Sequence, residues 1–508
     1  MKKTFLPLRR LSLLVITALS LTAVSCSDDD SNAINNPGAN APDVDFTALT
    51  TGNKIAYYNA RNLSAPTSTL DITGLQPSET ILSIDYRPAT GQLYALGSTS
   101  RLYFINEQSG LATALGAAAF TPAIASQNAS IDFNPTVDRI RLVTDSGQNL
   151  RLHPELGTVA ATDGSINGGT TPKIGAVAYT NSMAGASSTT LYDIDFQQDK
   201  LYIQNPPNDG GLQLVGDLTV DFATTVGFDI NPDNSVALAA TADAEGSKLY
   251  TINLETGKAN WVGNFETNIK SIAFKTNPVA FAVTATNKLH RFNPMDPAEN
   301  AVDLMGMMDG ETILGLDFRP ATGTLYAISS QSRLLTVNTA NGQVTAVGAA
   351  LTPAVLGTAV GFDFNPMVDR IRLVTNTGQN LRLHPDLGTV AATDGSLNPG
   401  SPSVSGAAYS NNYATTTSTV LYVLDAETNM LYTQTPPNDG TLVPVGAIGV
   451  DITADNGFDI GGGSNMAFGL LKAGNTTAVY SFNLTTGVAK KVKDFNINAI
   501  AMAVGLGF

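Results

Sequence analysis

The stretch from Asp132 to Gly164 reads DFNPTVDRIRLVTDSGQNLRLHPELGTVAATDG, and it returns from Asp363 to Gly395 as DFNPMVDRIRLVTNTGQNLRLHPDLGTVAATDG. When residues 132–167 are aligned with 363–398, five of the 36 positions differ. Repetition this close, at a separation of 231 residues, indicates a tandem duplication. The repeated segment therefore decides the fold of both halves of the chain.

The centre of this segment predicts a β-hairpin. Its apolar residues alternate with polar ones, which is typical of a strand with two different faces. A three-residue turn that ends at Gly147 pairs Leu142 with Leu150 and Ile140 with Leu152. A two-residue turn would mix the two faces, so the alternation itself selects the longer turn, with Gly147 in the left-handed conformation.

The same register places a cluster of basic side chains on the other face of the hairpin. Arg141 is expected opposite Arg151, and Arg139 opposite His153. The second copy repeats the cluster with Arg370, Arg372, Arg382 and His384. Like charges that face each other across a strand pair are destabilising unless acceptors answer them.

Three interpretations of the cluster stay open. In the first, the arginines are structural and pair with nearby acids, namely Asp132, Asp138, Glu155, Asp363, Asp369 and Asp386. In the second, Arg141, Arg151 and His153 contact an anion or a sugar. In the third, His153 is a general base, although the sequence shows no nucleophile or metal partner for it.

A shorter repeat lies inside the long one. Short apolar strands recur at intervals of 42 to 51 residues, and each is followed by turns and three further strands. Four-stranded repeats of this length are the signature of β-propeller blades. The sequence therefore predicts an all-β fold of ten four-stranded blades, arranged as two tandem five-bladed propellers or as one ten-bladed ring.

The ends of the halves bear on that choice. Each half begins with strands that lack a first strand and ends with a lone strand, IKSIAF or INAIAMAV. In two rings, each lone strand would close its own circle. In one ring, SIAFKTNPVAFAV would form an ordinary hairpin within a blade, so both arrangements stay open, with two rings preferred.

An aspartate recurs on the first strand of several blades. These residues are Asp85, Asp132, Asp229, Asp317, Asp363 and Asp459. They can form a ring that binds a cation, or they can accept hydrogen bonds from nearby backbone groups, which is the preferred interpretation. The sequence leaves the presence of a metal open and contains no recognisable cofactor motif, so no cofactor is expected.

The N-terminus predicts export and lipid anchoring. Residues 1–25 combine a basic start with an apolar segment that is too short for a comfortable membrane span, which is typical of a signal peptide. Cys26 follows directly and is the only cysteine, as expected for the lipidated residue of a bacterial lipoprotein. Residues 26–44 are rich in Asp, Asn and Pro and predict a flexible tether. We expect an outer-membrane lipoprotein that is exposed on the cell surface.

The amino-acid composition limits the kinds of molecule that the protein is expected to bind. Charged residues make up 14% of the 508 residues, and the formal net charge is −15. A chain this acidic cannot neutralise phosphates, so nucleic acid is not an expected partner. The expected partners are the membrane, through the lipid on Cys26, and a glycan or protein ligand.

The motif FNPxVDRIRLVT…GQNLRLHP, with RPATGxLYA before it and PPNDG after it, resembles a bacterial domain-of-unknown-function family of secreted and lipoprotein repeat proteins. The resemblance covers nearly all of 45–508 in two copies, which we divide at 45–276 and 277–508. It implies a propeller-like fold outside the cytoplasm and no particular activity.

Two classes of function follow from these observations. The first is a non-enzymatic binding or scaffolding lipoprotein on the cell surface, because no catalytic constellation is recognisable. The alternative is a propeller-based enzyme of the lyase or lactonase type, with its site at the central channel. Fold alone does not decide between them, because function depends on sites carried by the fold.

Overall fold

A computed structural model describes residues 41–222 and 226–508 of the chain. The expected signal peptide, Cys26 and most of the expected tether lie outside the described residues. Within the described part of the chain, no helix has the length and apolar character needed to span a lipid bilayer.

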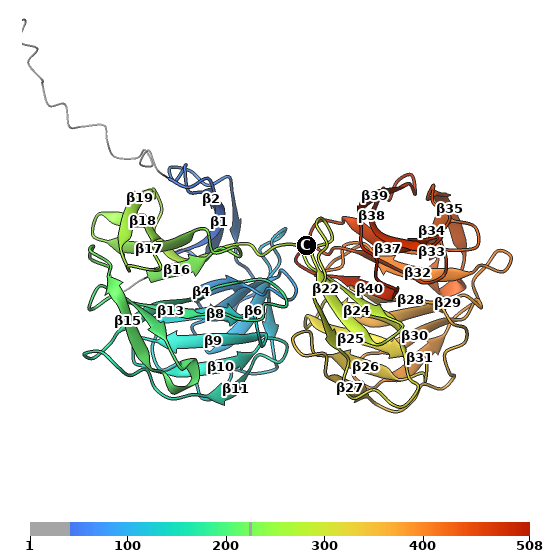
Figure 1. Ribbon diagram of the computed structural model, residues 1–508, viewed down its shortest axis with the longest axis horizontal. Helices are drawn as coiled ribbons and strands as arrows, with labels where there is room; N and C mark the ends of the chain where they lie inside the picture. Colours follow the sequence, from blue (N-terminus) through green and yellow to red (C-terminus); the bar gives the residue numbers. More distant parts are fainter. Residues whose placement is uncertain (1–40, 223–225) are drawn as a thin grey trace, which may run out of the picture. The chain divides into compact units, whose positions relative to one another are not determined.

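The first half of the described chain forms five antiparallel sheets of four strands each (Figure 1). In sheet order these are β20(Ile269–Ala273), β1(Asp45–Thr50), β2(Lys54–Asn59) and β3(Ser68–Asp71); β4(Ile81–Tyr86), β5(Leu93–Gly97), β6(Arg101–Ile105) and β7(Ala112–Leu115); β8(Ala129–Asn134), β9(Arg139–Thr144), β10(Asn149–His153) and β11(Thr158–Thr162); β12(Ile174–Tyr179), β13(Leu191–Asp195), β14(Lys200–Gln204) and β15(Leu212–Asp217); and β16(Val226–Ile230), β17(Ala237–Asp243), β18(Gly246–Ile252) and β19(Ala259–Asn264).

The second half repeats this arrangement with five more sheets (Figure 1). They are β40(Ala499–Val504), β21(Ala280–Thr284), β22(Lys288–Phe292) and β23(Ala301–Asp303); β24(Ile313–Arg319), β25(Thr324–Ser329), β26(Leu334–Val337) and β27(Val344–Val347); β28(Val360–Asn365), β29(Arg370–Thr375), β30(Asn380–His384) and β31(Thr389–Thr393); β32(Val404–Tyr409), β33(Leu421–Asp425), β34(Met430–Gln434) and β35(Leu442–Ala447); and β36(Asn456–Ile460), β37(Ala467–Ala473), β38(Thr476–Phe482) and β39(Ala489–Asp494). The fold is therefore all-β, as predicted, with ten four-stranded sheets.

The only helical turns among the described residues are two short 3-10 turns, η1(Pro207–Asp209) and η2(Pro437–Asp439). Each lies in a PPNDG segment and is closed by a glycine in the left-handed conformation, with φ of 70° at Gly210 and 71° at Gly440. Pro followed by Asn-Asp-Gly favours a turn, and both copies form one here.

One strand in each half comes from far along the chain. β20 pairs with β1, with Ala273 opposite Thr47, and β40 pairs with β21, with Val504 opposite Ala280. The hairpin between β20 and β21 that one large ring would require is not the pairing observed. Each half instead completes its earliest sheet with its own last strand.

The first strands of neighbouring sheets lie side by side. In the first half β4 contacts β8, β8 contacts β12, β12 contacts β16, β16 contacts β20, and β20 contacts β4. In the second half the same order runs through β24, β28, β32, β36 and β40 and returns to β24. The first strands of each half therefore form one group, on which the sheets converge.

Apolar side chains between adjacent sheets form the core. One cluster joins Leu96 and Leu102 of β5 and β6 to Ile140 and Leu150 of β9 and β10, and all four are buried. Burial of a large aliphatic side chain stabilises the fold by about 1.5–3 kcal/mol. Both faces of most sheets are covered. First strands such as β4 and β12 are therefore buried along their whole length and show no alternation of buried and exposed residues.

The repeated hairpin has the register expected from its alternation. Leu142 pairs with Leu150 and Ile140 with Leu152, and the Thr144 N–H donates to the Gln148 carbonyl at 3.1 Å. Three residues then remain for the turn, and the last of them, Gly147, has φ of 86°. The three-residue turn is confirmed, and the second copy repeats it at Gly378 with φ of 82°.

Adjacent sheets approach each other closely at a glycine after the hairpin. Gly388 has φ of 61°. A Cβ atom placed there would overlap the carbonyl of Val347 in the neighbouring sheet. The equivalent Gly157 meets Leu115 in the same way. Neither position leaves space for a side chain.

We predict that Gly388→Ala destabilises the protein by about 2–4 kcal/mol, because it adds a clash with the neighbouring sheet to the strain of a left-handed alanine. Gly310→Ala is the matched control, since Gly310 has φ of 69° and open space around it. Urea denaturation followed by circular dichroism measures both variants. An equal loss of stability in the two would contradict the close approach of the sheets.

Candidate functional site

The facing arginines of the hairpin share one carboxylate. Arg141 lies opposite Arg151, as predicted, and the side chain of Asp163 lies between them. Its Oδ2 atom is 2.6 Å from Arg141 Nη1 and 2.8 Å from Arg151 Nε. Burial alone would raise the pKa of Asp163, but hydrogen bonds from Arg151 and Arg141 lower it. The repulsion between two like charges is therefore answered within the same sheet.

Arg141 has further internal partners. Its side chain is 2% exposed, and it donates to Asn149 Oδ1 at 2.7 Å and to Asn208 Oδ1 at 2.8 Å. Asn208 belongs to η1 of the next sheet, so the arginine ties that turn to the hairpin. The second copy repeats the arrangement: Arg372 contacts Asp394, Asn380 and Asn438, and Arg382 also contacts Asp394.

The acids expected to answer these arginines have other roles. Asp138 and Glu155 bind Arg87, whose Nη2 is 2.5 Å from Asp138 Oδ2 and 3.0 Å from Glu155 Oε1. In the second copy Arg319 binds Asp369 and Asp386. The predicted assignment of these four acids to the hairpin arginines is therefore wrong. The chain turns back after β11 and places Asp163 beside Arg141, closer than the acids in the preceding loop.

Arg87 and Arg319 differ in exposure. The Arg87 side chain is fully buried and also donates to the Gly323 carbonyl at 3.0 Å, whereas Arg319 is 11% exposed and Asp386 is 59% exposed. The ion cluster around Arg87 is therefore less exposed to solvent than the one around Arg319.

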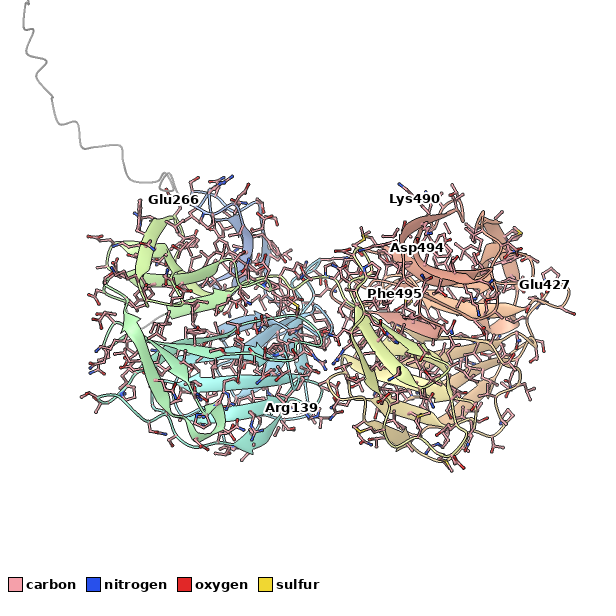
Figure 2. All side chains as sticks on the ribbon, in the orientation of Figure 1. Arg139, Glu266, Glu427, Lys490, Asp494 and Phe495 are labelled. Atoms are coloured by element: carbon pink, nitrogen blue, oxygen red, sulfur yellow. The ribbon has the colours of Figure 1, made fainter. Side chains whose placement is uncertain are left out.

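The histidines serve as acceptors in turns. His153 Nδ1 accepts the N–H of Glu155 at 3.4 Å, and His384 does the same for Asp386 at 3.3 Å. Burial and then the charges of Arg139 and Arg87 lower the pKa of His153 to about 4, so its ring is neutral at pH 7. Arg139, labelled in Figure 2, donates to the Asp138 carbonyl at 2.8 Å, as Arg370 does to Asp369. Hydrogen-bonded histidines of this kind fit a structural role.

The recurrent aspartates of the first strands accept backbone hydrogen bonds. Asp85 accepts the N–H of Tyr86 through Oδ1 and the N–H of Phe133, on the next first strand, through Oδ2, both at 2.7 Å. Asp229 accepts the N–H groups of Ile230 and Phe274 at 2.6 and 2.5 Å. These carboxylates join neighbouring sheets where no strand pairing does so.

The other aspartates follow the same pattern. Asp132 accepts the N–H of Tyr179 through Oδ1 at 2.9 Å. In the second half Asp317 and Asp459 each accept two backbone N–H groups, and Asp363 accepts the N–H of Tyr409 at 2.9 Å. Asp132 and Asp363 therefore face the group of first strands and make no ion pair with the hairpin arginines, contrary to their expected role as counter-charges.

The aspartates also come together in threes. One carboxylate oxygen from each of Asp85, Asp132 and Asp229 lies within 4.8 Å of the others, and Asp317, Asp363 and Asp459 form the same arrangement. All six are buried. Burial first, and then the charge of a neighbouring carboxylate, raises the pKa of Asp85 and Asp317 well above its usual value. We call these sets the first and the second aspartate triad.

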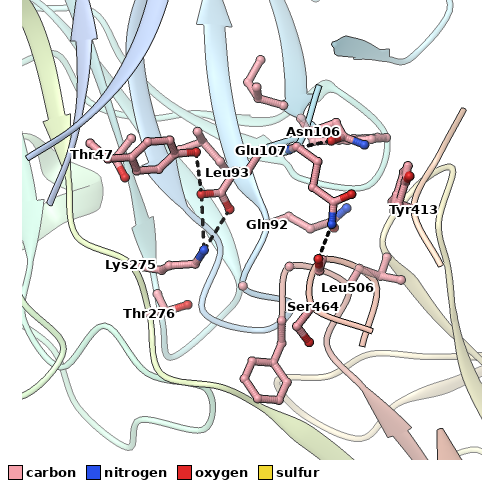
Figure 3. A pocket seen from close by; sticks show the side chains of 18 of the residues that line it. Thr47, Gln92, Leu93, Asn106, Glu107, Lys275, Thr276, Tyr413, Ser464 and Leu506 are labelled. Atoms are coloured by element: carbon pink, nitrogen blue, oxygen red, sulfur yellow. Dashed lines mark hydrogen bonds and ion pairs between the residues drawn. The ribbon is translucent and has the colours of Figure 1, made fainter. Parts of the chain in front are cut away.

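A separate cavity of about 820 Å³ has six aromatic and four amide residues among those that line it. Figure 3 shows it with Tyr413, Gln92, Asn106 and Ser464 among the lining residues. Its aromatic members include Phe46, Tyr57, Tyr58, Phe104, Tyr413 and Phe508. Apolar walls with a few polar groups are typical of small-molecule sites. Sequence reasoning missed this cavity, because its lining comes from segments far apart in the chain.

One wall of the cavity carries an ordered set of polar groups. Glu107 Oε1 accepts the hydroxyls of Tyr57 at 3.1 Å and Tyr86 at 2.7 Å. Lys275 lies 3.3 Å from the same carboxylate (Figure 3). Burial first, and then the charge of Glu107, raises the pKa of both tyrosines. The carboxylate is therefore held in one orientation, with the exposed Lys275 beside it.

Asp193 is a buried carboxylate without a partner in the described structure. It lies in β13 opposite Val177, is 0% exposed, and neither of its oxygens has a hydrogen-bond partner there. Burial raises its pKa well above the usual value, and the charge of Arg141 opposes this only in part. The equivalent residue in the second half, Val423, is packed in an apolar cluster.

We predict that Arg87→Ala costs about 3–5 kcal/mol, because it leaves two buried carboxylates without their counter-ion. Arg319→Ala is the matched control and should cost about 1–2 kcal/mol, since its partners reach solvent. Thermal and urea denaturation measure both variants. Equal losses of stability in the two variants would show that burial does not determine how much each ion cluster stabilises the fold.

We predict that Asp193→Val stabilises the protein by about 1–3 kcal/mol at pH 7, since it removes an unpaired buried acid. The folded pKa is raised, so the penalty is absent below the unfolded pKa of about 4 and grows as the pH rises toward the folded value. The advantage of the variant should therefore be small at pH 4 and larger at neutral pH. Val423→Asp should have the opposite effect, and a stabilising Val423→Asp would refute this account.

Comparison with curated proteins gives no significant match. Among solved structures, the chain is similar to a crystal structure of a 6-phosphogluconolactonase candidate from Bacteroides fragilis NCTC 9343, with 12% identity, 65% of this chain and 96% of that chain covered, and a TM-score of 0.27. A TM-score this low does not indicate a shared function. A family model described as a domain of unknown function matches residues 54–273 and again 288–504. Because the two matches together cover most of the sequence, the chain belongs to this family, DUF4394.

Proposed function

We propose that each half of the chain is a five-bladed β-propeller, with boundaries near 45–276 and 277–508. Two features support the proposal. The last strand of each half completes that half's earliest sheet, and the five first strands contact one another in a cyclic order. Closure by a strand from the other end of the chain is a common way to remove the open edges of a repeated sheet fold.

We further propose that the protein is a lipoprotein of the bacterial outer membrane, anchored through Cys26 and exposed on the cell surface. The basic and apolar N-terminal segment and the lone cysteine after it support this location. The acidic, polar segment that follows would act as a tether and hold the sheets away from the membrane.

Within this setting we propose a non-enzymatic binding function, with the cavity of about 820 Å³ as the ligand site. The observation that carries the proposal is the combination of aromatic walls with Gln92, Asn106 and Glu107 in one cavity of small-molecule size. Sugars present apolar C–H faces and hydroxyl groups, which match aromatic rings and amide or carboxylate groups. An oligosaccharide is therefore the ligand class that fits best.

The alternative of an enzyme at the centre of the first strands has less support. The carboxylates there accept backbone N–H groups, and four of the six use both oxygens in this way. A general acid or base must instead be free to reach substrate. The histidines of the hairpin turns, His153 and His384, lie outside the cavity lining.

We predict that a glycan array probed with the full chain identifies an oligosaccharide ligand, and that Tyr413→Ala weakens its affinity at least about tenfold, or about 1.4 kcal/mol. Tyr413 is half-buried in the cavity wall. Trp261→Ala is the matched control, because Trp261 is an aromatic residue that is 45% exposed and lies away from the cavity. Equal loss of affinity in both variants, or no glycan ligand at all, would reject the cavity as a sugar site.

A further inference from the structure

The two aspartate triads have more acceptor capacity than the structure satisfies. Within each triad, two carboxylates have both oxygens engaged by backbone N–H groups, and the third has one engaged oxygen. In the second triad that third residue is Asp363, which is 1% exposed. Its Oδ2 atom is fully buried and has no hydrogen-bond donor in the described structure. A buried oxygen of this kind calls for a partner, and the neighbouring side chain in the triad, Asp459, can donate to it only when one of the two carboxyls is protonated.

The triad carboxyl groups also lack a cationic partner. Among the described residues, the groups that shift the pKa values of these aspartates are other aspartates and backbone N–H groups, and none of them is lysine or arginine. The hydroxyl-bearing neighbours are Tyr179 beside Asp132 and Tyr409 beside Asp363. This contrasts with Asp163 and Asp394, where each carboxylate has two arginines.

The two halves differ close to the triads but keep all three acids. Ser83, whose Oγ accepts the Ile131 N–H at 3.1 Å, is replaced by Gly315 in the second half. Ser130, which accepts the Val177 N–H at 3.2 Å, is replaced by Gly361. The serine acceptors are thus lost in one copy. The fold therefore tolerates the loss of these serine acceptors beside the triad, whereas the three carboxylates occur in both halves.

We propose that each aspartate triad binds one hard divalent cation of the calcium class. Calcium takes oxygen ligands at about 2.4 Å, so three ligand oxygens around one ion lie no more than about 4.8 Å apart. The three oxygens of each triad meet this condition without rearrangement. Water would complete the coordination, and the backbone N–H groups would hold each carboxylate in place. The cation would supply the missing partner of Asp363 Oδ2 and offset the buried negative charge.

The test is isothermal titration calorimetry of the chelator-treated full chain with CaCl2, and separately with MgCl2. We expect two Ca²⁺ ions per chain and a rise in the melting temperature when Ca²⁺ is present. Asp363→Asn and Asp132→Asn should each reduce the stoichiometry to one ion, and the double variant should bind none. Asparagine keeps an oxygen that can accept the Tyr409 or Tyr179 N–H, so both variants should fold.

The control is Asp309→Asn, because Asp309 is an exposed acid outside the triads and should keep both ions. Loss of one ion in Asp309→Asn would contradict the assignment to the triads. If the folded wild-type chain binds neither Ca²⁺ nor Mg²⁺ at millimolar concentration, the proposal is wrong, and protons must neutralise the triads. This outcome does not depend on the sugar site, because the triad residues do not line the cavity.

Discussion

Backbone N–H groups on the inner edge of each first strand have no partner strand on that side, and such groups must be satisfied when they are buried. The structure meets this constraint with aspartate. Asp85 on β4 accepts the N–H of Phe133 from the β8 strand, and Asp229 accepts that of Phe274 after β20. The sheets are thereby connected where they meet, and the consequence is a concentration of buried carboxyl groups at that place.

The duplicated hairpin also buries polar groups that need partners, but these lie away from the first strands. Its facing arginines, Arg141 and Arg151, share the carboxylate of Asp163, and Arg141 reaches into the next sheet through Asn208. Removal of Asp163 would leave the buried Arg141 without its counter-charge. This dependence favours retention of the segment in both halves and does not require a catalytic role.

Much of the fold follows from local pattern. The alternation around Gly147 determines the hairpin register, and repeated strands at regular intervals indicate the four-stranded sheets. The partners of the charged side chains do not follow in this way. Asp163 lies 22 residues from Arg141, and Asp85 lies 48 residues from Phe133, so their contacts depend on how strands and sheets are packed. Local sequence patterns also do not reveal the cavity, because the residues that line it come from several segments between Asp45 and Phe508.

The pairing of β20 with β1 and of β40 with β21 also affects how the protein is made. During synthesis or export, β1 emerges more than 200 residues before the strand that covers its edge. Throughout that time it presents unpaired N–H and C=O groups, which invite pairing with other chains. Closing a loop of this length is also slow. An exported chain of this design would depend on chaperones to keep the early edge covered until its own last strand arrives.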